Sequence, residues 1–306
     1  MNVLMISGDK NILVEGSSAH TRLLLQRAQV DRLDVFVWPH VHSLRQIREA
    51  AAHGQYDVIT AQDPFWRGHL AWHLSRTYHT KLNLQVHTDL LAEPWWRRQW
   101  AYVQLRRATS IRVVSERAKL YLAHLFPEKK MTVLPIYIDI LRFSSVIRRP
   151  HAGKNILWIG RFEDEKNPLE AICVLREVLR EVPDARLTMI GEGSWRQRLL
   201  DAAANLPVTI SLTWQDPLLY LDTADVLLST SKYESWGAVF IEALAAGVPV
   251  VAPDVGIARE AGATVVPRPW LAAAVAQVLR SGTRGVLQIT LPTAAEWAHA
   301  WRGTLI

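Results

Sequence analysis

The sequence predicts an α/β fold with two doubly wound parallel sheets, each covered by helices. Short apolar runs typical of buried strands alternate with amphipathic stretches along the chain. A length of 306 residues suits two domains. A polar stretch with Pro150 and Gly153 interrupts the alternation, as an interdomain linker does. We therefore expect a first domain over 1–145, a second over 153–290 and a closing helix over 291–306, for which packing back on the first domain is one option.

The strands expected in the first domain are short runs of apolar and β-branched residues bounded by polar or turn residues. They are Asn2–Ser7, Leu33–Trp38, Asp57–Ala61, Lys81–His87, Ser110–Val114 and Thr132–Pro135. Between them, segments such as Ala19–Gln29 and His69–Tyr78 repeat apolar residues at the spacing of a helix. The segment Arg142–Lys154 then reads as the linker.

The second half repeats the alternation more regularly. Its expected strands are Asn155–Ile159, Arg186–Ile190, Val208–Leu212, Val226–Ser229 and Val250–Ala252. Its expected helices are Pro168–Val182, Trp195–Ala204, Pro217–Leu221, Ala238–Ala246, Trp270–Arg280 and Ala294–Arg302. Strands that alternate with helices pair in parallel, so ligands should bind at the carboxyl ends of the strands.

Composition narrows the classes of protein. Hydrophobic residues make up 49% and charged residues 21%, which is typical of a folded globular chain. No apolar run approaches the roughly 20 residues that span a bilayer, and Met1–Ser7 lacks the charged region of a signal peptide. We therefore expect a cytoplasmic protein, either soluble or peripheral at the inner face of the membrane. The single cysteine, Cys173, lies in a helical pattern and is expected to be buried and unreactive.

The segment from Tyr233 to Ala252 carries the strongest functional signal. Gly237 separates a polar loop from a helix, whose start offers free backbone N–H groups to an anion. Glu234 lies just before this potential anion-binding site, and Glu242 lies in the second turn of the helix. A carboxylate accepts two hydrogen bonds from a vicinal diol, and a nucleotide sugar has two such diols. The spacing alone fits equally well an ordinary surface helix with two solvated glutamates.

This segment resembles the E-x7-E signature of retaining glycosyltransferases of the GT-B fold, family four. Glu234 and Glu242 match its two glutamates, and Asp225–Ser229 and Glu242–Val251 match its flanks. The resemblance implies two Rossmann-like domains that face a cleft, and a nucleoside-diphosphate sugar as the donor.

The resemblance also implies a role for each residue of the segment. Glu234 would hold hydroxyls of the transferred sugar, and Glu242 would hold those of the ribose. The backbone N–H groups of Gly237, Ala238 and Val239 would contact the diphosphate.

Arg161 and Lys166 are two cations on the loop after the first strand of the second half. Alone, they could simply pair with Glu163, Asp164 and Glu165 on the same loop. The loop is similar to the family's motif of Arg and Lys, which implies that both cations stabilise charge on the leaving diphosphate.

Three further loops resemble family elements, with departures in two of them. Gly193 closes a G-x-G loop that would approach the nucleotide, with Ser194 where proline is usual. Gly16 lies in the phosphate loop of the first domain, with Ser17 where a second glycine is usual. His87 ends a strand and would hydrogen-bond the transferred sugar, although a histidine there can also be structural.

The stretch Pro94–Arg107 alternates tryptophan and arginine. As a helix it would place Trp96, Trp100, Val103 and Arg107 on one face. Such a face suits a membrane interface or a lipid-linked acceptor, and it also suits a buried helix whose arginine stems reach outward. We favour the buried helix. A net charge of +6 would suit nucleic acid, but no basic-aromatic module is present and we expect no such partner.

The resemblance implies a retaining glycosyltransferase, and the lack of a metal-binding motif predicts that it is metal-independent. It would move a hexose from a nucleoside-diphosphate sugar to a hydroxyl of a glycan or a lipid-linked acceptor, as in cell-envelope polysaccharide biosynthesis. No D-x-D motif is present, so we expect neither a metal nor any other cofactor.

Trp214 and Asp216 lie where a nucleotide base could stack, without indicating which base. Two alternatives to a glycosyltransferase stay open. The chain could be a non-catalytic subunit that binds nucleotide sugar, or another GT-B enzyme such as an epimerase.

Overall fold

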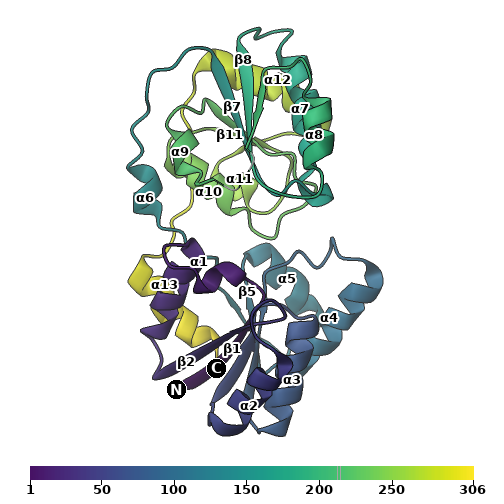
Figure 1. Cartoon of the computed structure of the whole chain (residues 1–306), viewed down its shortest axis with the longest axis vertical. Helices are drawn as coiled ribbons and strands as arrows, with labels where there is room; N and C mark the ends of the chain where they lie inside the picture. Colours follow the sequence, from purple (N-terminus) through teal and green to yellow (C-terminus); the bar gives the residue numbers. More distant parts are fainter. Residues whose placement is uncertain (212, 214) are drawn as a thin grey trace. The chain divides into compact units, whose positions relative to one another are not determined.

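The computed structural model describes residues 1–211, 213 and 215–306. The chain divides into two α/β units, and each is considered by itself (Figure 1). The first comprises Met1–Tyr137 with Pro292–Ile306, and the second comprises Ile138–Leu291. The first unit thus ends before the expected boundary at residue 145. The cause is helix α6 (Ile140–Ser144), which buries Phe143 and packs on helix α10 (Ala238–Ala245), although the sequence indicated a linker from Arg142.

The first unit contains six parallel strands in the order β2-β1-β3-β4-β5-β6. Each of the strands expected there overlaps an observed one. They are β1 (Asn2–Ser7), β2 (Arg32–Val37), β3 (Val58–Ala61), β4 (Lys81–Val86), β5 (Ser110–Val113) and β6 (Lys130–Val133). The order reverses between β1 and β3, which makes the sheet doubly wound.

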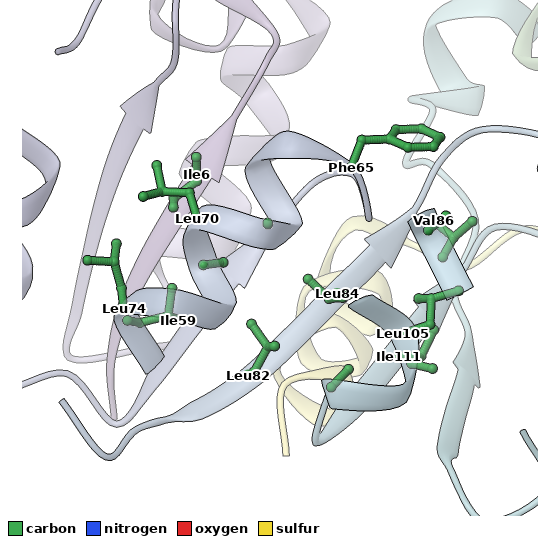
Figure 2. Close-up of a cluster of buried hydrophobic side chains, with 14 of the residues drawn as sticks. Ile6, Ile59, Phe65, Leu70, Leu74, Leu82, Leu84, Val86, Leu105 and Ile111 are labelled. Atoms are coloured by element: carbon green, nitrogen blue, oxygen red, sulfur yellow. The ribbon is translucent and has the colours of Figure 1, made fainter. Parts of the chain in front are cut away.

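Both faces of this sheet are buried, because consecutive residues of β1, β3, β4 and β5 are shielded from solvent. Leu4 and Ile6 of β1 point to one face and Val3 and Met5 to the other, following the two-residue period of a strand. Figure 2 shows the first face, where Leu70 and Leu74 of helix α3 lie against the strands.

The helices of the first unit follow the strands in order. They are η1 (Lys10–Leu13), α1 (Ser18–Arg27), α2 (Leu44–His53), α3 (Trp66–Thr77), α4 (Trp95–Arg107) and α5 (Glu116–Leu125). Helix α4 contradicts the favoured prediction of a buried Trp–Arg helix. It buries Ala101, Tyr102 and Leu105, whereas Trp95 and Trp96 are 71% and 59% exposed.

The C-terminal helix α13 (Ala294–Thr304) packs on the second face of the first unit's sheet. It begins with a capping box between Thr293 and Glu296. Trp297 and Trp301 are buried among the apolar residues of β1 and α1. The indole N–H of Trp297 donates to the carbonyl oxygen of Pro135 at 2.8 Å, so its polar atom is satisfied in the core.

The second unit also contains six parallel strands, in the order β12-β11-β10-β7-β8-β9. They are β7 (Lys154–Ile159), β8 (Ala185–Ile190), β9 (Val208–Ile210), β10 (Val226–Leu228), β11 (Val250–Ala252) and β12 (Thr264–Val265). The order reverses between β7 and β10. A sheet of this type binds ligands beyond the carboxyl ends of the two strands at the reversal.

The helices of the second unit are η2 (Asp164–Lys166), α6, α7 (Pro168–Val178), α8 (Arg196–Ala202), α9 (Leu218–Leu221), α10, α11 (Ala258–Ala261), η3 (Arg268–Trp270) and α12 (Leu271–Ser281). Helix α7 turns Ala171, Ile172 and Leu175 into the core. Cys173 therefore faces outward and is exposed, contrary to the prediction of a buried thiol.

None of the helices described here has the length and apolar character that crossing a membrane requires.

Replacing Trp301 with alanine should destabilise the first unit by about 3–5 kcal/mol, because it leaves a cavity between α13 and β1. Urea unfolding of the full chain measures the change. Trp270→Ala is the matched control, since Trp270 is 63% exposed and its loss should cost less than about 0.5 kcal/mol. Equal losses of stability in the two variants would contradict the packing described for α13.

Candidate functional site

The predicted residues Lys166 and Glu234 meet at the strand reversal of the second unit. Lys166 ends η2 in the loop after β7, and Glu234 lies in the loop after β10. The two side chains form an ion pair, and they are only 19% and 10% exposed. The hydroxyl of Ser231 donates a second hydrogen bond to the same carboxylate oxygen at 2.8 Å. Lys166 therefore pairs across the two loops, not with the acids of its own loop.

Hydrogen bonds of the Thr230 hydroxyl hold these two loops together. The hydroxyl of Thr230 lies 3.0 Å from the carbonyl oxygen of Lys166 and 2.9 Å from that of Asn167. The indole N–H of Trp158, at the end of β7, donates to the same hydroxyl at 2.9 Å. Asn167 has a left-handed backbone at φ 46°, which lets η2 turn directly into α7. The position of Lys166 is therefore set by buried contacts.

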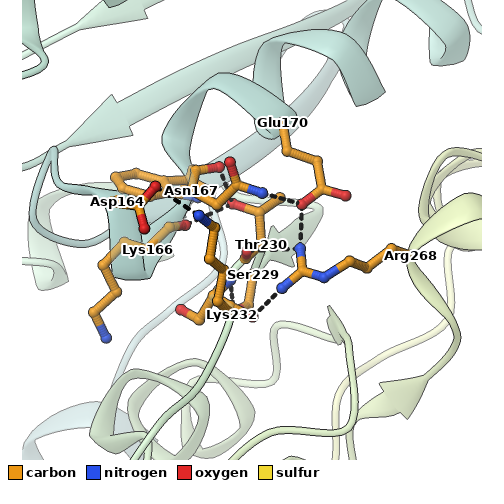
Figure 3. A network of polar contacts seen from close by, with 10 residues as sticks. Asp164, Lys166, Asn167, Glu170, Ser229, Thr230, Lys232 and Arg268 are labelled. Atoms are coloured by element: carbon orange, nitrogen blue, oxygen red, sulfur yellow. Dashed lines mark hydrogen bonds and ion pairs between the residues drawn. The ribbon is translucent and has the colours of Figure 1, made fainter. Parts of the chain in front are cut away.

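Arg268 ties this arrangement to the loop after β12 (Figure 3). Its guanidinium donates to the carbonyl oxygens of Thr230 at 3.0 Å and Ser231 at 2.7 Å, and it pairs with Glu170 of α7. Glu170 also accepts from the side chain of Asn167 at 2.6 Å. The sequence analysis missed Arg268, because an isolated arginine after a proline carries no local signal of these partners.

Lys232 adds a further link between the two loops. Its ammonium group donates to Asp164 at 2.6 Å, and its backbone N–H donates to the carbonyl oxygen of Glu165 at 2.8 Å. In Figure 3, Lys232 lies over the network while the side chain of Lys166 extends away from it.

Helix α10 begins beside the Lys166–Glu234 pair. Gly237 is its N-cap and has a φ of 98°, in the left-handed region that favours glycine. A Cβ at Gly237 would lie 2.6 Å from the ring of Phe240. Among the described residues, no side chain caps this helix, so the first-turn N–H groups at Ala238 and Val239 point beyond the helix. Glu242 is half-buried one turn further on.

Arg161 differs from Lys166 in its surroundings. It pairs with Glu165 at 2.7 Å, within its own loop, and its side chain is 73% exposed. The alternative in which the loop charges pair with one another therefore applies to Arg161. An exposed guanidinium of this kind can swing toward an anion, since a surface ion pair is weak.

The glycines of the G-x-G loop have a packing role. A Cβ at Gly193 would lie 2.5 Å from the carbonyl oxygen of Phe162, and one at Gly191 would lie 1.8 Å from that of Gly160. Ser194 donates to Glu163 through its N–H at 2.7 Å and its hydroxyl at 2.8 Å. These hydrogen bonds hold the pKa of Glu163 below its usual value. Ser194 thus anchors this loop to the loop of Arg161.

In the first unit, Gly16 lies in the loop before α1. Its φ of 79° is left-handed, and no atom lies within 4 Å of the position of an added Cβ. Ser17, which stands where the family usually has glycine, is the N-cap of α1. Its hydroxyl accepts from the N–H of His20 at 3.0 Å and donates to the carbonyl oxygen of Asn11 at 2.6 Å. That hydroxyl is therefore engaged in shaping the loop.

His87 follows β4 at the carboxyl edge of the first unit's sheet. Burial, together with the nearby positive charges of Arg112 and Arg22, lowers the pKa of its imidazole to about 3. Its Nε2 atom is buried and finds no hydrogen-bond partner in the part of the chain that the structure describes. A neutral imidazole with an unused nitrogen can donate to, or accept from, a hydroxyl.

Of the two residues that the sequence suggested for base stacking, Trp214 lies outside the described residues and Asp216 pairs with Arg142. Among the described residues, no three His, Cys, Asp or Glu side chains gather as a metal ion would require.

Replacing Arg268 with alanine should lower the free energy of unfolding by about 1–3 kcal/mol, because Glu170 and two carbonyl oxygens lose their donor. Urea unfolding measures this loss. The exposed pair of Arg259 and Asp254 offers the control: Arg259→Ala should cost less than about 0.5 kcal/mol. Similar small losses in both variants would show that Arg268 does not brace the loops.

His87 should make the first unit sensitive to acid. Its folded pKa lies below that of the unfolded chain, so the unfolded state takes up the proton first as the pH falls through the window from about 6.5 to about 3. Between pH 7 and pH 5 this uptake should lower the free energy of unfolding by about 2 kcal/mol. In His87→Gln that part of the pH dependence should vanish. Parallel pH profiles for the two proteins would contradict it.

Known glycosyltransferases resemble this chain in sequence. Residues 140–266 match the family model described as "Glycosyl transferases group 1". A glycogen synthase of Mycobacterium tuberculosis is 36% identical over 165 residues, which cover 49% of this chain and 40% of the relative. An alpha-monoglucosyldiacylglycerol synthase of Streptococcus pneumoniae is 25% identical, over 67% of this chain and 53% of the relative. The chain thus spans about half the length of these relatives.

A structure titled trehalose-6-phosphate from E. coli, bound with UDP-2-fluoro glucose, superposes with a TM-score of 0.72. The match covers 99% of each chain at 14% identity, and it shows that the fold is shared. The prediction of a GT-B fold, with two doubly wound Rossmann-like units, is confirmed. Residues 140–266 are therefore similar to the glycosyl transferases group 1 family, within a chain that has the GT-B fold.

Proposed function

We propose that this protein is a glycosyltransferase that moves a hexose from a nucleoside-diphosphate sugar to an acceptor hydroxyl, with retention of configuration and without a metal ion. The observation that carries the proposal is the largely shielded ion pair of Lys166 and Glu234 beside the start of α10, which no side chain caps among the described residues. A cation, a carboxylate and free N–H groups at a strand reversal suit a ligand that contains both phosphate and hydroxyl groups.

Each group has a role in breaking the bond between the sugar and the diphosphate. Charge grows on the leaving phosphate as this bond breaks, and Lys166, Arg161 and the N–H groups of Gly237, Ala238 and Val239 would stabilise it. Glu234 would accept hydrogen bonds from the sugar hydroxyls, and Glu242 would accept them from the ribose. Gly193 would serve by keeping its loop close to the nucleotide.

The acceptor oxygen would attack the anomeric carbon from the side on which the diphosphate leaves, which retains the configuration. Its proton would pass to the departing phosphate. In the first unit, Gly16 would contact phosphate, and neutral His87 would hydrogen-bond the transferred sugar.

The relatives support the acceptor class only in outline. Their names concern glycogen and a glucosylated diacylglycerol, so we propose a glycan or a lipid-linked sugar as the acceptor. A cytoplasmic location with peripheral contact at the inner face of the membrane, and a role in cell-envelope polysaccharide biosynthesis, would follow. Nucleic acid is not a proposed partner.

A second function has one observation in its favour. Because the hydroxyl of Ser17 already caps α1, the first unit offers less to phosphate than a loop with two glycines. A non-catalytic subunit would bind nucleotide sugar without turnover.

The donor site can be tested by thermal shift with UDP, GDP, ADP and their sugar conjugates. A ligand at a hundred times its Kd adds about 2.7 kcal/mol, so one nucleotide series should raise the Tm of the wild type. Glu242→Ala should lose this shift, because the ribose hydroxyls lose their acceptor. Glu177→Ala, at an exposed position of α7, should keep it.

Release of nucleoside diphosphate in the presence of mixed glycan and lipid acceptors then separates the two functions. Turnover that persists with EDTA supports the metal-independent transferase. Binding without turnover supports the non-catalytic subunit. If no nucleotide shifts the wild type, the proposed donor site is wrong.

A further inference from the structure

Helices α3 and α4 of the first unit have an unusual composition. Their 25 residues include six arginines and five tryptophans but no aspartate or glutamate. The helices are neighbours: the rings of Trp66 on α3 and Trp100 on α4 lie 5.4 Å apart. Nothing in the donor site of the second unit accounts for this pair of helices.

Part of this composition forms one exposed surface, which we name the Trp–Arg face. Trp66, Trp95 and Trp96 are 64%, 71% and 59% exposed. On α4, residues 96, 103 and 107 follow at helical spacing, and all are exposed. The face consists of Trp66, Trp95, Trp96, Val103, Arg106 and Arg107. Soluble proteins rarely expose several large aromatic side chains together without a partner for them.

The surrounding contacts hold the face in shape. The ring of His69 lies 5.2 Å from that of Trp100 at a tilt of 45°, and Trp100 in turn contacts Trp66. The guanidinium of Arg107 lies 3.7 Å from the ring centre of Trp72, and that of Arg106 lies 5.7 Å from the ring of Phe126. The arginines thus bury their stems against aromatic rings and keep their charge at the surface.

The positive charge of the face is largely uncompensated. The nearest acids in the sequence, Asp63 and Glu93, already pair with Arg67 and Arg97. For Arg98, Arg106 and Arg107 the structure records no ion pair among the residues it describes. A partner that covers this face must therefore bring both negative charge and an environment for exposed indole rings.

We propose that the Trp–Arg face binds the surface of a bilayer that contains anionic phospholipid. Indole rings partition into the region between head groups and acyl chains, and arginines beside them contact lipid phosphate. The aliphatic residues Leu91 and Val103 are 46% and 37% exposed and would enter the same region. They would add nothing to the stacking of nucleic-acid bases, which favours the bilayer over a single strand.

The position of the face indicates how a bound bilayer would serve the transfer reaction, an inference that rests on the proposed function. Strand β4 ends at Val86, His87 follows, and α4 begins at Trp95. The start of α4 therefore belongs to the same carboxyl edge as His87. A docked bilayer would bring the head of an amphiphilic, lipid-linked acceptor to that edge.

Vesicle flotation with the full chain tests the proposal. Vesicles of phosphatidylcholine with half phosphatidylglycerol should bind the wild type at least tenfold more tightly than phosphatidylcholine alone, and high salt should weaken this binding. The double variant Trp95→Ser, Trp96→Ser should lose at least tenfold in affinity, and so should Arg106→Gln, Arg107→Gln. Trp270→Ser is the matched control, because it removes an equally exposed tryptophan from the second unit.

Two results would overturn the proposal. One is wild-type protein that ignores anionic vesicles, and the other is face variants that bind them as well as Trp270→Ser does. Loss of binding to single-stranded nucleic acid or to a protein, with unchanged vesicle binding, would assign the face to that partner instead. Nucleotide thermal shifts of the same variants separate this outcome from a failed donor site, because the substitutions lie outside that site.

Discussion

The proposed donor site depends on one interaction, the ion pair of Lys166 and Glu234. Both side chains are largely buried, and a buried charge without its partner is strongly destabilising. The loops after β7 and β10 must therefore stay together for the second unit to be stable. The side chains of Thr230 and Arg268 hold the loops together by donating hydrogen bonds to main-chain carbonyl oxygens. These contacts do not depend on which side chains the bonded residues carry. The groups that brace these loops are thus distinct from most of the groups proposed to bind the ligand.

The topology explains why these loops meet. Strands β7 and β10 are neighbours in the sheet but lie about 70 residues apart in the chain. At such a reversal in a doubly wound sheet the connections leave the two strands toward opposite faces, and ligands bind beyond the carboxyl ends of those strands. Helix α10 starts from one side of this space, and its first N–H groups and the ammonium of Lys166 favour negative charge there.

Helices cover both faces of the sheet in the first unit. Its sheet is completed on one face by α13, a helix from the end of the chain that brings Trp297 and Trp301 into the core. On the other face, α3 and α4 bury residues such as Leu74 and Leu105, while Trp66, Trp95 and Trp96 are exposed. The half-buried, neutral His87 lies at the sheet edge where α4 begins.

Local physics explains what the sequence determined by itself. The spacing of apolar residues predicted the strands and helices of both units. A parallel strand that is buried on both faces is rich in apolar residues, and a helix repeats them at every third or fourth position. Gly237, Gly247 and Pro249 marked the ends of α10 because cap geometry depends on only a few adjacent residues. The two glutamates could be placed near that helix for the same reason.

Only the tertiary structure decided features that depend on distant partners. The exposure of Cys173 and of the Trp–Arg face depends on which side of a helix meets the sheet, and helical spacing does not specify that side. Ser17 became a helix cap, and Ser194 became an anchor for Glu163, because the folded chain supplied their partners. Arg268 braces loops whose residues lie up to about 100 positions away, so only folding could bring it to them.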